Sequence, residues 1–348
     1  MSLSPDQWLP RLGSDFQICL QQMDIATNRG LLVWLDENAY RNASFLDQRA
    51  LAHNPPGQWF GLDDIWRTAN GTGAPHYIFH TGHCGSTLIS RLLDGLGGFG
   101  LREPLPLRSM AEAEPALGEA WSLFSHETFE NGLTRLNGLW GRKPASGTTP
   151  IVKATSLCSG LSEQLLTLSP QSRALTLGLG LERYLATVLA GQYAPFEFRS
   201  AAALRLQRLA SLGIGDLPMA HEMDTPDFAA LAWLTETLAA RKLAQTHDGR
   251  VLHVDFDQFL EAPADHLGRI AGHFGLAASE DQIRTAISSP TMTRYSKAPE
   301  HGYSTDLRDQ VVARSMAENS AAIGKGIAWA RQCAARSDLI SEMIGDLP

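Results

Sequence analysis

The chain has 348 residues, a length that allows one α/β domain with additions or two smaller domains. Hydrophobic residues make up 44% and charged residues 19%, values typical of a globular protein rather than a disordered chain. The formal net charge of −8 argues against a general nucleic-acid-binding protein, which would carry a broad basic face.

Residues 1–70, the first predicted region, are interpreted as a small helical cap. Phe16, Leu20 and Met23 are spaced as on one face of a helix. We expect this cap to cover one side of a core that residues 71–348 form.

From residue 75 the pattern changes to short apolar runs, most of which lead into a stretch of helical periodicity. Leu181, Leu185 and Leu189, for example, recur at the spacing of a helix face after one such run. Strands that alternate with helices indicate a parallel sheet covered on both sides. The sequence therefore predicts an α/β fold of three layers. The predicted strand segments are residues 76–82, 99–104, 149–156, 172–180 and 250–260.

Two largely helical stretches, at about 111–137 and 200–246, lie between these strand–helix units. We interpret both as helical insertions or lids. Neither carries a readable motif, and we expect specificity for any ligand to reside in them and in the cap.

The candidate chemistry lies in a glycine-containing loop, residues 82–87 (GHCGST), between the first predicted strand and its helix. A turn of this kind points backbone N–H groups at an anion, and the helix N-terminus adds about half a positive charge. Gly82 and Gly85 allow the tight path, while the hydroxyls of Ser86 and Thr87 can donate to phosphate oxygens. The sequence therefore predicts a P-loop that binds phosphate.

The loop lacks the lysine of a nucleoside-triphosphatase loop, because Gly85 runs directly into Ser86. No aspartate at a predicted strand end is readable as a magnesium ligand, so ATP or GTP hydrolysis is disfavoured. The eleven histidines are scattered and form no H-E-x-x-H motif, and we expect no protein-built metal site.

Cys84 lies at the start of the helix beside His83, a setting in which cysteine nucleophiles occur. A phosphatase loop of that kind needs a C-x5-R pattern, but Ser90 stands at the arginine position. We therefore interpret Cys84 as a small residue at a crowded position of the phosphate-binding loop.

Two stretches carry a resemblance to a known family. Residues 80–94 (HTGHCGSTLISRLLD) resemble the 5′-phosphosulfate loop of the sulfotransferase family, whose core is a basic residue, a small residue, Gly, Ser/Thr and Thr. Residues 250–276 resemble the late signature of that family, an apolar strand, an aromatic–acidic pair, a proline and a helix ending in Phe-Gly or Leu-Gly. The resemblance covers about residues 75–310 and implies a divergent bacterial-like member.

The resemblance implies a metal-independent enzyme that passes a sulfuryl group from 3′-phosphoadenosine 5′-phosphosulfate to a hydroxyl or amine of a small-molecule or peptide acceptor. His83 stands where the family has a Lys or Arg that stabilises the leaving phosphate, and Glu103 where tyrosylprotein sulfotransferases have their catalytic glutamate. Lys153 resembles a lysine of those relatives. From the residues alone, Glu103 could equally pair with Arg102 or Arg108, and Lys153 could be a snorkelling side chain.

The family usually holds the 3′-phosphate with an arginine that is missing here from the end of the fourth strand. Arg183 and Thr187, one helical turn apart, could rebuild this contact, or Arg183 could pair on the helix surface. Residues 293–308 are similar to the loop that closes over the nucleotide in the family, which makes Lys297 and Arg308 further candidates.

Two alternatives remain. One is a non-catalytic nucleotide-binding protein on a sulfotransferase scaffold, because position 83 is a histidine and the 3′-phosphate clamp is incomplete. The other is a different P-loop transferase such as a small-molecule kinase, which would need the missing lysine and a magnesium ligand.

The cysteines and the N-terminal stretch predict a cytoplasmic protein. Cys19, Cys84, Cys158 and Cys333 are widely spaced, which fits neither a zinc ribbon nor a disulfide framework and indicates a reducing compartment. Residues 1–16 lack a basic region followed by an apolar core, so no secretion signal is expected. No apolar run approaches the roughly 20 residues of a membrane span.

Overall fold

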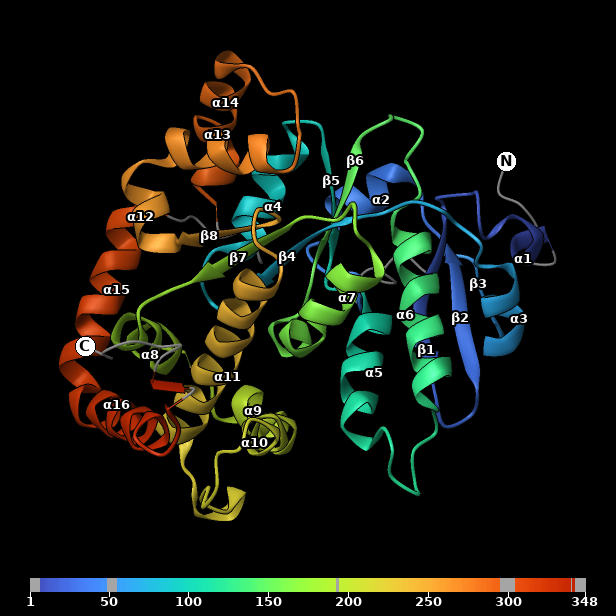
Figure 1. Ribbon diagram of the computed structural model, residues 1–348. Coiled ribbons are helices and arrows are strands. Elements are labelled where there is room, and N and C mark those ends of the chain that lie inside the picture. The colour runs from blue at the N-terminus through green and yellow to red at the C-terminus, as the bar shows by residue number, and fades with distance from the viewer. Residues whose placement is uncertain (1–6, 49–54, 192–193, 295–303, 339, 342–348) are drawn as a thin grey trace.

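A five-stranded sheet forms the centre of the molecule (Figure 1). The computed structural model describes residues 7–48, 55–191, 194–294, 304–338 and 340–341. The strands of this sheet are β4 (His76–His80), β5 (Gly98–Arg102), β6 (Thr149–Lys153), β7 (Ala174–Gly178) and β8 (Val251–Asp255). They pair in parallel in the spatial order β5-β6-β4-β7-β8, which confirms the predicted α/β class with a central parallel sheet.

Helices cover both faces of this sheet. The helices that follow β4 in the chain are α4 (Ser86–Asp94), α5 (Leu105–Ala113), α6 (His126–Trp140), α7 (Ser162–Leu168), α8 (Leu181–Leu189), α9 (Ala194–Ser200), α10 (Ala202–Ser211), α11 (Thr225–Thr246), α12 (Phe256–Glu261), α13 (Pro263–His273), α14 (Glu280–Ile287), α15 (Thr305–Glu318) and α16 (Ser320–Ala334). In Figure 1, α4 and α13 lie on one side of the strands and α11 on the other, so the core has three layers.

Strand β4 shows how the sheet divides the core. Side chains alternate along a strand, so Tyr77 and Phe79 point to one face and Ile78 to the other. Tyr77 and Phe79 belong to the apolar cluster that contains Leu136 of α6, whereas Ile78 belongs to the cluster that contains Leu88 of α4. Because β4 lies between β6 and β7, its carboxyl end opens at the middle of the sheet edge, where ligands bind in such folds.

The N-terminal region contains a three-stranded antiparallel sheet, so the prediction of a helical cap over residues 1–70 is wrong. The helical spacing of Phe16, Leu20 and Met23 misleads because Ile18 and Leu20 are also alternate buried residues of a strand. The strands are β1 (Ile18–Asp24), β2 (Arg29–Trp34) and β3 (Gly57–Gly61), accompanied by the short helices α1 (Trp8–Arg11), α2 (Glu37–Asn42) and α3 (Leu62–Thr68).

The two stretches interpreted as helical insertions or lids do contain helices, and the longest helix of each packs into the core. α6 buries Phe129, Leu133 and Leu136, and α11 buries the run 229–234. The predicted domain boundary between residues 70 and 71 stays a prediction. Within the ranges that the structure describes, no helix is both long and apolar enough to cross a bilayer.

Candidate active site

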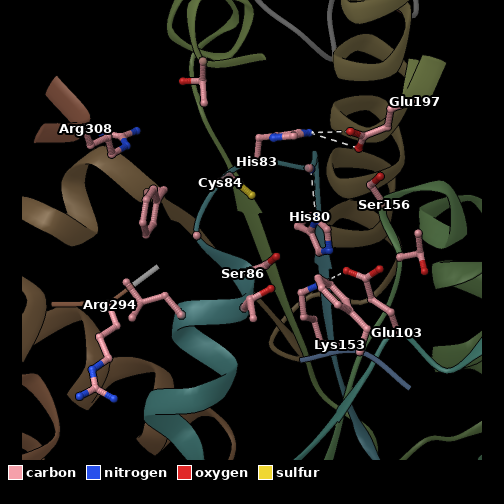
Figure 2. A pocket seen from close by; sticks show the side chains of 18 residues that line it. His80, His83, Cys84, Ser86, Glu103, Lys153, Ser156, Glu197, Arg294 and Arg308 are labelled. Carbon is pink, nitrogen blue, oxygen red and sulfur yellow. Dashed lines mark hydrogen bonds and ion pairs between the residues drawn. The ribbon is translucent and has the colours of Figure 1, made fainter. Parts of the chain in front are cut away.

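A cavity of about 440 Å³ opens at the carboxyl edge of the central sheet. It is lined by the whole predicted loop, residues 82–87, and also by Glu103, Thr187 and Arg308. Figure 2 shows Arg294 and Arg308 on one side of the loop, and Glu103 with Lys153 on the other. The parallel strands thus bring together residues that lie far apart in the sequence.

The path of the loop depends on left-handed backbone at Gly82, His83 and Gly85, whose φ angles are 88°, 52° and 70°. Glycine adopts this region freely, but histidine does so at a cost in conformational energy. Among the described residues, only four that are not glycine have positive φ, and His83 and Glu103 (φ 55°) are two of them. Strained backbone of this kind is typical of functional sites.

His80, the last residue of β4, anchors the start of the loop. Its Nδ1 accepts a hydrogen bond from the Gly82 N–H at 3.0 Å, and its Nε2 lies 2.8 Å from the Ala154 carbonyl oxygen. Because a carbonyl oxygen only accepts, Nε2 carries the proton and the ring is neutral. His80 is therefore a structural link between the loop and the segment after β6.

The N-terminus of α4 supplies the groups that suit an anion. Ser86 and Thr87 are buried in its first turn, where backbone N–H groups have no partner within the helix. The Thr87 hydroxyl has no hydrogen-bond partner among the described residues. A buried hydroxyl without a partner is costly, and an oxygen of a bound phosphate or sulfate would satisfy it.

The ring of Phe256 packs against the loop at Gly85. A Cβ atom on Gly85 would lie 1.9 Å from Cε2 of the Phe256 ring, far inside van der Waals contact. Phe256 follows β8 at the start of α12 and belongs to the second sequence motif, residues 250–276. The two motifs therefore meet in space, because an aromatic ring of one packs on a glycine of the other.

Glu103 and Lys153 form an ion pair at the ends of the neighbouring strands β5 and β6. The Lys153 side chain is 1% exposed and that of Glu103 is 20% exposed, so the pair lies in the wall of the cavity. The alternative partners of Glu103 are engaged elsewhere, because Arg102 pairs with Asp94 and Arg108 pairs with Glu112. Lys153 is thus buried and paired, not snorkelling.

Arg183 lies outside the cavity lining, where it pairs with acidic residues on the helix surface. Its Nε is 3.2 Å from Asp257, which also takes the Arg308 guanidinium at 2.8 Å. Of the two interpretations of Arg183, the structure therefore shows surface pairing. Thr187 does reach the cavity, and Lys297 lies outside the described residues.

Arg308 is the predicted cation that the structure brings to the cavity. Its side chain is 10% exposed, and its guanidinium lies 5.3 Å from the centre of the Phe256 ring. The ring and Asp257 hold the guanidinium beside the loop, which makes Arg308 a candidate for the second charged group of a nucleotide.

Sequence reasoning missed Arg294 and Glu197, which also line the cavity. Glu197 lies on α9 and contacts the ring of His83, although 114 residues separate the two in the chain. Arg294 lies within residues 293–308, the stretch that resembles a nucleotide-closing loop, but was not among the candidates, whereas no local pattern marks Glu197. In the described part of the chain, no group of three or more His, Cys, Asp or Glu side chains is placed to hold a metal ion.

Sequence comparison finds no matching family model and no matching curated protein. Among solved structures, this chain is similar to the sulfotransferase domain from the curacin biosynthetic pathway, with 11% identity, a TM-score of 0.40, and coverage of 72% of this chain and 98% of that one. It is also similar to the sulfotransferase domain of the Synechococcus PCC 7002 olefin synthase, with 13% identity, a TM-score of 0.38, and coverage of 80% and 97%. Sulfotransferase STF1 from Mycobacterium tuberculosis H37Rv gives 15% identity, a TM-score of 0.37, and coverage of 72% and 83%. Values this low assign no activity.

Proposed function

We propose that this chain is a sulfotransferase-like enzyme that moves a sulfuryl group from 3′-phosphoadenosine 5′-phosphosulfate to a hydroxyl or amine of a small-molecule or peptide acceptor, without a metal ion. The observation that carries the proposal is the content of one cavity. It joins an anion-binding loop at a helix N-terminus with a carboxylate, Glu103, that a buried lysine keeps in place.

The residues of the cavity fit a donor with two separate anionic groups. The loop and the partnerless Thr87 hydroxyl suit the phosphosulfate, and Arg308 and Arg294, which line the cavity on one side of the loop, suit the 3′-phosphate. The four cysteines are all buried and unbridged, which supports the cytoplasm as the compartment.

In the proposed reaction, Glu103 acts on the acceptor, and His83 and the loop act on the donor. The bond from the acceptor oxygen or nitrogen to sulfur forms as the bond from sulfur to the bridging phosphate oxygen breaks, and that oxygen keeps the electron pair. Glu103 takes the acceptor proton, since its carboxylate lies in the cavity wall and is held there by Lys153. His83 and the N–H groups of the loop donate to the leaving phosphate, where negative charge accumulates.

Thermal unfolding with added nucleotides tests the proposal. Adenosine 3′,5′-bisphosphate, the expected product, should stabilise the protein by about 2.7 kcal/mol at a concentration one hundred times its Kd, whereas ATP with magnesium should not. Stabilisation by ATP with magnesium alone would indicate a kinase-like transferase. Binding of the bisphosphate without any sulfuryl transfer to a broad acceptor panel would indicate a non-catalytic nucleotide-binding protein.

Arg308→Met should weaken the binding of adenosine 3′,5′-bisphosphate by about 10- to 100-fold, the effect expected when one charge-assisted hydrogen bond is lost. The fold should tolerate the change, because Arg183 still neutralises Asp257. Isothermal titration calorimetry measures the affinity. Arg284→Met is the matched control, since Arg284 is exposed on α14, away from the cavity. Equal affinities for the two variants would remove Arg308 from the binding site.

A further inference from the structure

The side chain of His83 contacts a carboxylate from outside the loop. Its Nε2 lies 3.2 Å from both Oε1 and Oε2 of Glu197 (Figure 2). A carboxylate can only accept, so Nε2 must carry a proton and donate it to Glu197. This contact fixes which ring nitrogen is protonated and how the imidazole is turned.

The Glu197 carboxylate is presented by a packed helix. The next residue of α9, Phe198, is 3% exposed, and its ring lies 6.1 Å from the ring of His83 and 6.3 Å from that of Tyr184. Helix α9 in turn packs on the core helix α11. Glu197 and the ring contact thus hold the imidazole from two sides, although the Glu197 side chain itself is 53% exposed.

We propose that Glu197 is a positioning residue that acts through His83, an inference that rests on the proposed sulfuryl transfer. A lysine in the loop carries a compact charge with three rotatable N–H donors, whereas an imidazole must be turned correctly. With Nε2 donating to Glu197, Nδ1 is left for the leaving phosphate oxygen, and it donates there when the ring carries both protons. The carboxylate also balances the positive charge of the ring when both nitrogens are protonated, as the aspartate does in a Ser-His-Asp triad.

The test compares Glu197→Gln in two backgrounds. With His83 present, we expect this substitution to lower kcat for sulfuryl transfer about tenfold, the order of loss seen when the hydrogen-bond partner of a metal-bound histidine is removed. Donor KM should change little. In the His83→Lys variant, the same substitution should have no effect, because a lysine needs no carboxylate to orient it. Equal losses in both backgrounds, or no loss in either, would overturn the proposal.

A spectroscopic measurement gives an answer that does not depend on any activity. In the ligand-free protein, the ¹⁵N chemical shifts of the His83 ring should show the proton on Nε2, and Glu197→Gln should mix the two tautomers. Glu182→Gln, an exposed glutamate of α8, should leave the spectrum unchanged. A wild-type ring protonated on Nδ1 alone would refute the role of Glu197. Failure of the bisphosphate titration would instead refute sulfuryl transfer, and it would leave this spectrum as expected.

Discussion

Gly85→Ala should lower the free energy of unfolding by about 3 kcal/mol and abolish binding of adenosine 3′,5′-bisphosphate. The new methyl group would lie 1.9 Å from a carbon of the Phe256 ring, so the loop or the ring must move. Overpacking of this kind costs about 1–3 kcal/mol, and left-handed backbone adds about 1–2 kcal/mol for any residue with a Cβ. Urea unfolding followed by linear extrapolation measures the loss.

Gly275→Ala is a matched control for this prediction. Gly275 has a φ of 69°, against 70° for Gly85, but a Cβ atom there would meet nothing within 4 Å. The control should therefore lose only the backbone contribution of about 1–2 kcal/mol and keep its affinity for the nucleotide. If the two variants lost the same stability, the contact between the loop and Phe256 would contribute nothing.

Glu103→Gln should lower kcat for sulfuryl transfer by about a hundredfold or more while leaving the affinity for adenosine 3′,5′-bisphosphate unchanged. The amide cannot accept the acceptor proton, and loss of a general base typically costs 10²- to 10⁴-fold, in round numbers. The groups proposed to bind the nucleotide belong to the loop and to Arg308, which the substitution leaves unchanged. Steady-state kinetics and calorimetry on the same preparation separate the two effects.

Glu112→Gln provides the control, because Glu112 is an exposed carboxylate of α5 that pairs with Arg108. It should keep full activity. Glu103→Gln also removes the counter-ion of the buried Lys153, so its folded fraction must be checked by urea unfolding before rates are compared. Full activity of a folded Glu103→Gln protein would rule out Glu103 as the base.

The loop could be predicted from sequence because its determinants are local. Gly82 and Gly85 are required where the backbone turns left-handed, and Ser86 follows as the first residue of α4. The parallel sheet was also readable, since buried strands between helices appear as short apolar runs. Local patterns led to a wrong prediction around Leu20. The spacing of Leu20 and Met23 fits a helix, but Ile18 and Leu20 also alternate along a strand.

The partners of the site could not be predicted, because they are brought together by the packing of distant elements. The approach of Glu197 to His83 depends on where α11 places α9, and no spacing in the sequence records it. Nothing in the sequence tells which of Arg183 and Arg308 reaches the cavity. In the structure both arginines pair with Asp257, but of the two only Arg308 lines the cavity.

The two hydrogen bonds of His80 bear on the order in which the donor and the acceptor bind. One reaches the backbone of Gly82 in the donor loop, and the other reaches Ala154, the neighbour of Lys153. A single imidazole thus connects the backbone of the donor loop to the segment that directly follows Lys153. Any shift of the loop on donor binding would be passed to the acceptor side, so we expect the two substrates to add in a preferred order.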